Sequence, residues 1–147
     1  MHEGLLRHGR FLMAALWLVG ALLDARAAEV SKGDAQKVRE VIQAQLAAFA
    51  ADDAERAFSY AAPAIREQFG SPERFIAMVR QGYPVVFRPA SVTFLRPDWV
   101  DGQLLQAVQM TDAAGAMWLA VYHLQRQPDR SWRISGCEVV QNEGRAT

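Results

Sequence analysis

The first half of the chain carries apolar residues in a helical pattern. Between residues 38 and 49 they recur every three or four positions, which places them on one face of a helix. Asp34 is the predicted cap of this helix, because its carboxylate can accept hydrogen bonds from the first turn. Asp52 or Asp53 is predicted to end the helix and to cap a second one, which Pro63 must break.

After a third predicted helix, from Ser71 to Gly82, the apolar pattern takes on the period of a strand. Four strands are expected, over residues 92–95, 103–111, 117–127 and 132–140. Asp101-Gly102 is a typical two-residue hairpin turn between the first two of them. Because the helices come first and an antiparallel meander follows, the predicted class is α+β, with N-terminal helices packed on an antiparallel sheet of about four strands.

The two central strands carry no charged side chain. No Asp, Glu, Lys or Arg occurs in residues 103–111 or 117–125. Strands without charge on either face are usually covered on both sides, whereas three helices can cover only one face of a sheet. The other face would expose an apolar patch larger than monomers usually carry. This pattern predicts a homodimer through the sheet.

Residues 1–27 have the three parts of a secretory signal peptide. A basic stretch ends at Arg10, thirteen apolar residues follow over 11–23, and Ala25-Arg26-Ala27 forms a cleavage box of the A-x-A type. A helix of thirteen residues spans about 20 Å, which is short of a hydrocarbon core of about 30 Å. We therefore expect cleavage before Ala28, a periplasmic or secreted protein, and no membrane attachment after cleavage.

The rest of the chain is expected to form one domain. Residues 28–33 are predicted to be a polar lead-in, residues 34–140 a single α+β domain, and residues 141–147 a flexible tail. The whole chain is 51% hydrophobic and 22% charged, which is typical of a globular protein with a real core. After cleavage thirteen basic residues face fourteen acidic ones. A nearly neutral protein is a poor partner for nucleic acid, which binds a surplus of Lys and Arg.

Few residues are candidates for catalysis or metal binding. His123 is the only histidine after cleavage; it is either a hydrogen-bonded sheet residue or, with a nearby acid, the base of an isomerase-, dehydratase- or hydrolase-like enzyme. One histidine and Cys137 are too few for a zinc site, so no catalytic residue, metal or cofactor is predicted. By strand alternation Cys137 should face away from Ile134 and act as a packing thiol.

Three segments of the chain are similar to a family of small exported bacterial proteins that is catalogued as a domain of unknown function. They read VIQAQL at 41–46, GYP at 82–84 and SWRISGC at 131–137. The order of helices and strands also resembles the nuclear transport factor 2-like fold, which is also called cystatin-like or ketosteroid-isomerase-like. This resemblance implies a curved sheet that wraps the first helix into a cone whose mouth can hold a small molecule. The turn before the last strand usually carries glycine in the family, whereas Arg130 stands there and is expected to strain it.

Aromatic residues are the best candidates for a binding site. Trp118 and Tyr122 share one strand face, and Tyr60 and Tyr83 lie at helix ends, where the mouth of such a cone would be. Aromatic rings with a polar atom suit apolar pockets, although the same rings also occur in ordinary cores and interfaces. We therefore predict a non-catalytic binding or interaction domain. Its partner would be a small apolar ligand in the cone, or another protein or a second copy on the sheet.

Overall fold

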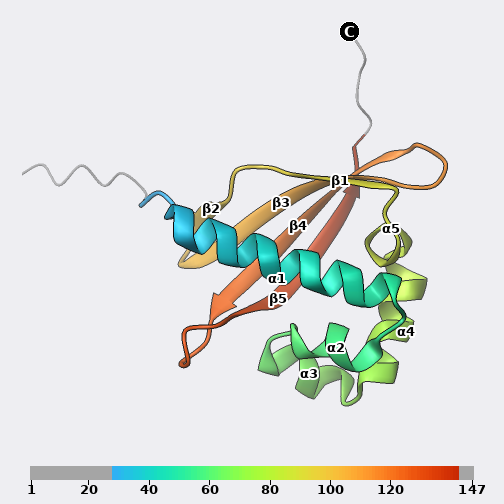
Figure 1. Cartoon of the computed structure of the whole chain (residues 1–147), viewed down its shortest axis with the longest axis horizontal. Coiled ribbons are helices and arrows are strands. Elements are labelled where there is room, and N and C mark those ends of the chain that lie inside the picture. Colours follow the sequence, from blue (N-terminus) through green and yellow to red (C-terminus); the bar gives the residue numbers. More distant parts are fainter. Residues whose placement is uncertain (1–27, 143–147) are drawn as a thin grey trace, which may run out of the picture.

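The computed structural model describes residues 28–142, and the chain runs from helices to strands (Figure 1). The predicted signal peptide, which ends at Ala27, and the last five residues of the predicted tail lie outside the described residues. The helices are α1 Lys32–Ala50, α2 Ala54–Ser59, α3 Pro63–Phe69, α4 Pro72–Gly82 and α5 Pro84–Phe87. The strands are β1 Ser91–Phe94, β2 Asp98–Val100, β3 Gln103–Thr111, β4 Met117–Arg126 and β5 Trp132–Gln141.

The helix starts follow from capping residues. Asp53 caps α2 and Ser71 caps α4, each accepting a hydrogen bond from a backbone N–H, as predicted. The predicted cap of α1 is wrong: Ser31 caps it, and its Oγ accepts from the backbone N–H of Asp34 at 3.1 Å. Asp34 lies instead in the first turn, where its negative charge still favours the helix start.

The sheet is antiparallel and has five strands in the order β1-β3-β4-β5, with β2 also paired to β3. β1 pairs with residues 108–111 of β3, and β2 pairs with residues 103–105 of the same strand. The edge strand is therefore split into two short pieces, and Pro97, which has no N–H to donate, lies in the break. These findings confirm the α+β class.

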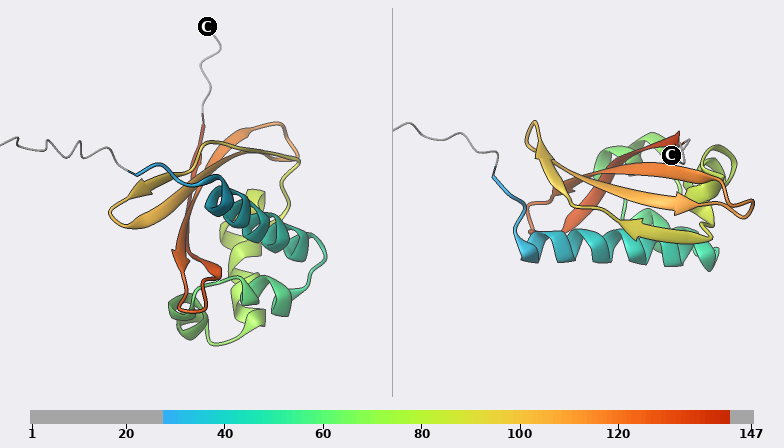
Figure 2. Two further views of the ribbon diagram at one scale, coloured as in Figure 1. Left: turned by 60° about the vertical axis from the view of Figure 1, so that its left-hand side comes forward. Right: turned by 90° about the horizontal axis from the view of Figure 1, so that it is seen from above.

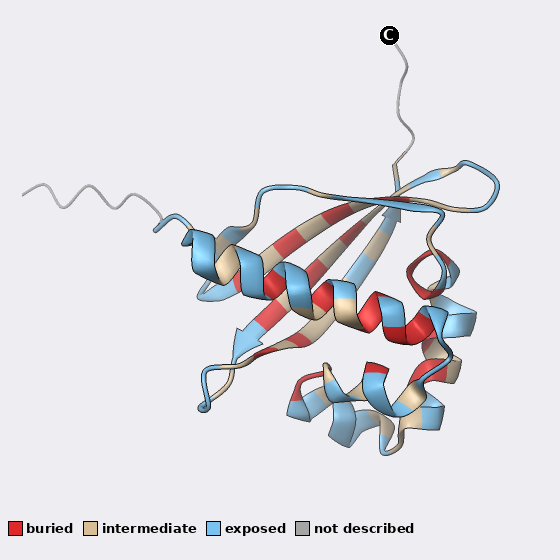
Figure 3. Cartoon of the chain, viewed as in Figure 1, coloured by how far each residue is buried: buried red, intermediate tan, exposed pale blue. Residues whose placement is uncertain are grey.

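The five helices of the described residues all lie on one side of the sheet (Figure 2). The sheet twists and curves, and α1 crosses its concave side. Buried residues form a stripe on α1 and alternate along β3 and β4 (Figure 3). Phe49 and Trp132, the two aromatic residues that anchor α1 and the start of β5, are both buried. We call the helix-covered face of the sheet the inner face and the opposite face the outer face.

Two local departures from regular geometry bear on the sequence predictions. Arg130 has a φ of 72°, in the left-handed region that favours glycine, which agrees with the strain expected at this turn. The register between β4 and β5 shifts after His123, so that Gly136 lies opposite His123 while Ile134 lies opposite Leu124. Ser135 is thus an extra residue in β5, a β-bulge.

Within residues 28–142, no helix combines the length and the apolar character needed to cross a membrane.

Candidate ligand-binding cavity

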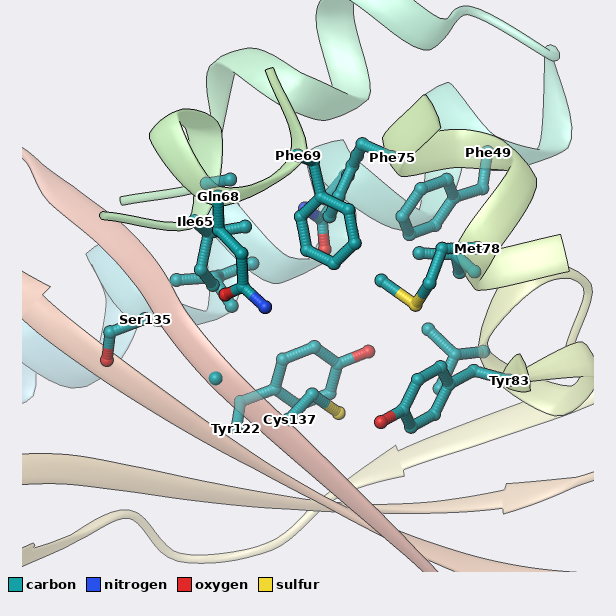
Figure 4. A pocket seen from close by; sticks show the side chains of 16 residues that line it. Phe49, Ile65, Gln68, Phe69, Phe75, Met78, Tyr83, Tyr122, Ser135 and Cys137 are labelled. Carbon is teal, nitrogen blue, oxygen red and sulfur yellow. The ribbon is translucent and has the colours of Figure 1, made fainter. Parts of the chain in front are cut away.

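A cavity of about 290 Å³ lies between the helices and the inner face of β4 and β5 (Figure 4). Sixteen residues line it. Phe49 reaches it from α1, Phe69 from α3, and Phe75 and Met78 from α4. Tyr122 of β4 lies below them at the sheet (Figure 4). Val86 adds a contribution from α5, so the cavity has aromatic and aliphatic walls from four helices and a floor from the sheet.

The walls are held by a cluster of phenylalanine rings. Phe75 stands at its centre, with ring centroids 6.0 Å from Phe49, 5.5 Å from Phe58 and 5.8 Å from Phe69. These separations and the tilted geometry are favourable for aromatic pairs. Phe75 is positioned by the start of α4, where Ser71 caps the helix and Pro72 begins it. The packing of α1, α2, α3 and α4 thus sets the shape of the cavity.

The β-bulge at Ser135 places Cys137 on the cavity floor. Because of the extra residue, Cys137 pairs with Tyr122 and faces the same side of the sheet as Ile134, and both line the cavity. The alternation that predicted opposite faces for Ile134 and Cys137 is therefore wrong. A glycine in a strand often marks a bulge, and Gly136 was the residue in the sequence that could have revealed it.

The titratable groups on the floor are uncharged at neutral pH. Burial, and then the adjacent Cys137, raise the pKa of Tyr122 well above its ordinary value of 10.0. Burial, and then the negative charge of Glu138, raise the pKa of the Cys137 thiol to about 12. Both groups therefore keep their protons, and each offers a neutral donor to the cavity.

The Tyr122 hydroxyl has no hydrogen-bond partner among the described residues, although the side chain is 0% exposed. Ser135 Oγ, also on a residue that lines the cavity, is buried without a partner as well. Gln45 differs, because its Nε2 donates to the backbone oxygen of Ala57 at 3.1 Å. Among the described residues that line the cavity there is no Asp, Glu, Lys, Arg or His. The cavity thus combines apolar walls, neutral polar atoms and no charged side chain.

The four predicted binding residues do not form one site. Tyr83 and Tyr122 both line the cavity. Tyr83 also lines a second pocket together with Trp118, so this tyrosine stands between the two pockets. Tyr60 lies apart, beside Trp132 in a third pocket. Trp118 is on the inner face, like Tyr122, as the alternation predicts.

The indole of Trp118 is already engaged by a neighbouring turn. Its Nε1 donates to Asp112 Oδ2 at 2.9 Å. This hydrogen bond, and a second from the backbone N–H of Ala116, lower the pKa of Asp112 below its ordinary value of 3.8. Trp118 therefore has a structural role at the β3–β4 turn and no free donor for a ligand.

His123 lies on the outer face, because it follows the inward-facing Tyr122. Its Nδ1 is 3.1 Å from Gln103 Oε1, and its Nε2 is 3.5 Å from Glu138 Oε1. A nearby acid therefore exists, but the Glu138 side chain is 76% exposed and the pair stands on the opposite side of the sheet from the cavity floor.

Periodicity indicated the buried faces of α1 and α4, including Phe49 and Phe75, but not that these faces border a cavity. Phe69 and Met78 were not identified as wall residues, because nothing in a helical pattern says what a helix packs against. For metals, no cluster of three or more His, Cys, Asp or Glu side chains suitable for an ion occurs within residues 28–142.

A family model described as a domain of unknown function (DUF4864) matches residues 31–147. This span includes all the helices and strands that the structure describes, because α1 begins at Lys32. Neither a curated protein nor a solved structure matches the chain.

Proposed function

Since the chain belongs to the family described as a domain of unknown function (DUF4864), we propose a function from its cavity: it is a non-catalytic binding domain for a small apolar ligand. The observation that carries this proposal is a cavity of about 290 Å³ with phenylalanine walls and no charged side chain among its described lining residues. Ligand pockets are typically about 300–1,000 Å³, mostly apolar, with a few polar groups that orient the ligand.

The chemistry of the floor supports binding over catalysis. A general base or a nucleophile must lose or share its proton near the working pH. The raised pKa values of Tyr122 and Cys137 keep both groups protonated. His123 and Glu138, the acid–base pair on β4 and β5, face away from the cavity. A binding role needs only what the cavity has, namely shape, apolar surface and neutral donors.

The proposal includes the fold family and the compartment. A curved sheet with α1 across its concave side and a cavity between sheet and helices supports a nuclear transport factor 2-like fold. The A-x-A box before Ala28 supports export and cleavage of residues 1–27. In this proposal the domain binds its ligand in the periplasm or outside the cell.

Native mass spectrometry of protein purified from the periplasm tests both parts together. We expect the intact mass of a chain that starts at Ala28, together with a small bound molecule whose mass is lost on denaturation. Met78→Trp should fill the cavity and lose the bound molecule, since Met78 lines the wall. Val100→Trp, at an exposed position of β2, is the matched control and should keep it. A full-length mass contradicts export, and a bound molecule that Met78→Trp retains contradicts binding in the cavity.

A second candidate function is self-association through the outer face. None of the helices within residues 28–142 covers this face, and β3 and β4 present residues other than Asp, Glu, Lys and Arg there, with Leu105, Leu119 and Val121 half-buried. Val140, beside Leu119, is 54% exposed. Charged side chains on this face come from the neighbouring strands, with Glu138 beside Val121 and Asp98 beside Leu105. The uncharged centre over β3 and β4 can meet a second copy of itself across a two-fold axis.

Sedimentation at high micromolar concentration tests this candidate. Val121→Arg places a charge on the outer face and should give a folded monomer. Ala120→Arg is the matched change on the inner face, where Ala120 is fully buried, and should unfold the domain. A wild-type protein that sediments as a monomer contradicts the homodimer.

A further inference from the structure

Tyr122 presents a buried donor that the protein itself does not use. Its side chain is 0% exposed, and no atom within residues 28–142 forms a hydrogen bond with its hydroxyl. In Figure 4 the hydroxyl points from the floor into the space below Phe69 and Met78. Buried hydroxyl groups without a partner are costly and uncommon in native proteins, so each one calls for an explanation. The explanation that the geometry supports is a ligand oxygen that accepts a hydrogen bond from this hydroxyl.

The surroundings of the hydroxyl exclude a charged partner. The described lining residues contain no ionisable cation that could neutralise an anion and no carboxylate that could hold a cation. An ion that entered would lose its hydration without gaining an opposite charge, which is strongly unfavourable. The second titratable group on the floor, the Cys137 thiol, is itself neutral. The ligand must therefore be uncharged.

The walls favour a ring. Phe49, Phe69 and Phe75 come from three different helices, and their rings stand at angles of 36° and 64° to one another in the two adjacent pairs. Such surfaces can contact both the face and the edge of a flat ring. We infer that the cavity takes an uncharged, ring-containing molecule whose carbonyl or hydroxyl oxygen accepts a hydrogen bond from Tyr122 Oη. This inference rests on the proposed binding function and names its ligand class.

Three probes of similar size separate the features of this ligand class. Acetophenone has a ring and a carbonyl oxygen, ethylbenzene has the ring without an acceptor, and benzoate carries a negative charge. Dissociation constants from ligand-observed NMR titrations of the exported protein at pH 7.5 should be compared for wild type, Tyr122→Phe and Tyr60→Phe. Tyr60→Phe is the matched control, because it removes the same hydroxyl from a tyrosine outside the cavity.

We expect Tyr122→Phe to weaken acetophenone binding by about threefold to tenfold, the effect of one hydrogen bond, and to leave ethylbenzene binding unchanged or tighter. Tyr60→Phe should change neither constant. Wild-type protein should bind benzoate more weakly than both neutral probes. If Tyr122→Phe changes the dissociation constants of acetophenone and ethylbenzene equally, the assigned hydrogen bond is overturned. If benzoate binds as tightly as acetophenone, the restriction to uncharged ligands is overturned. In both cases the proposed function stands. Failure of all three probes to bind overturns the proposed function and the inference with it.

Discussion

Gln106 and Tyr122 lie directly opposite each other across β3 and β4, and their surroundings differ sharply. Both are polar residues on the inner face, with 1% and 0% of their surface exposed. Gln106 Nε2 donates to the backbone oxygens of Leu95 and Ala107 at 2.7 and 2.9 Å. Tyr122 Oη donates to no acceptor in the part of the chain that the structure describes. The side-chain N–H groups of Gln106 are therefore paired with backbone oxygens, whereas the hydroxyl of Tyr122 is unpaired among the described residues.

The difference follows from what borders each residue. Gln106 lies beside the split edge strand, where Leu95 follows the end of β1 and its carbonyl needs a donor. The glutamine side chain supplies the hydrogen bond that a continuous strand would have made. Tyr122 borders β5, whose backbone is already paired, and the cavity. A buried polar residue is therefore no sign of a binding site by itself; the sign is a polar atom that the fold leaves without a partner.

The largest expected effect compares the packing of two parts of the core: the cavity half, where Tyr122 and the phenylalanine walls lie, and the Gln106 half, beside the split edge strand. Phe49→Ala should lower the free energy of unfolding by about 3–5 kcal/mol, because the Phe49 ring contacts both Phe75 and Phe87. Leu104→Ala, on the Gln106 half, should cost about 2–5 kcal/mol. Urea unfolding measures both. A cost below about 1 kcal/mol for Phe49→Ala would mean that the cavity wall is loosely packed.

Next in size is the loss of the engaged donor. Gln106→Leu keeps a buried side chain of similar volume but leaves the Leu95 carbonyl without its partner. The expected cost is about 1–3 kcal/mol, the range for an unsatisfied buried polar group. Chemical denaturation of the variant checks this value. An unchanged stability would mean that water or another donor replaces the glutamine, and the contrast with Tyr122 would disappear.

The cavity half should also lose stability in alkali, while Gln106, which cannot titrate, contributes nothing to this effect. The pKa of Cys137 is raised from 9.0 to about 12 by burial. Below pH 9 both folded and unfolded states hold the proton and stability is complete. As the pH rises above 9 only the unfolded state releases it, so stability falls by about 1.4 kcal/mol per pH unit, or about 1.4 kcal/mol by pH 10.

Urea unfolding at pH 8, 9 and 10 measures this slope. Cys137→Ser removes the thiol and should flatten the curve between pH 9 and 10. Tyr122 should contribute only above pH 10, since burial raises its pKa from an ordinary value that is already 10.0. An equally steep curve in Cys137→Ser would assign the alkaline sensitivity to another group.

The smallest expected effect has the opposite sign. Tyr122→Phe should raise the free energy of unfolding of the ligand-free protein by about 1 kcal/mol, because it removes a buried hydroxyl that has no partner. Thermal and urea unfolding of ligand-free protein measure the gain. A loss of stability would show that the hydroxyl is engaged within the protein after all, and Tyr122 would then resemble Gln106.

Local rules predicted most of the fold. The caps Asp53 and Ser71, the break at Pro63 and the hairpin turn at residues 101–102 are encoded in a few adjacent residues, and all four are present. α5 was not predicted, because its buried residues 85–87 form an apolar run with no period that distinguishes a helical turn from a strand. β2 was missed for a similar reason: its pairing with β3 is tertiary, and only three residues take part.

The candidate site was less accessible to sequence reasoning. Tyr83 and Tyr122 were named as binding residues and both line the cavity, because an inward strand position and a helix end can be read from period and caps. The phenylalanine walls could not be found, since their contacts join α1, α3 and α4 across long sequence separations. Cys137 was assigned to the wrong face because one extra residue, Ser135, reverses the alternation beyond it.

The two borders of the sheet have a consequence for aggregation. On one border β1 and β2 have only four and three residues, with Pro97 between them. On the other, the chain at Tyr60–Ala62 pairs with Ile134 of β5, through the hydrogen bonds Ala62 N–H to Ile134 O at 2.7 Å and Ile134 N–H to Tyr60 O at 2.8 Å. Short, interrupted or covered edges are poor templates for an added strand. The split border and the part of β5 at Ile134 are therefore poor sites for adding a strand, which lowers the tendency of the sheet to polymerise edge to edge into fibrils.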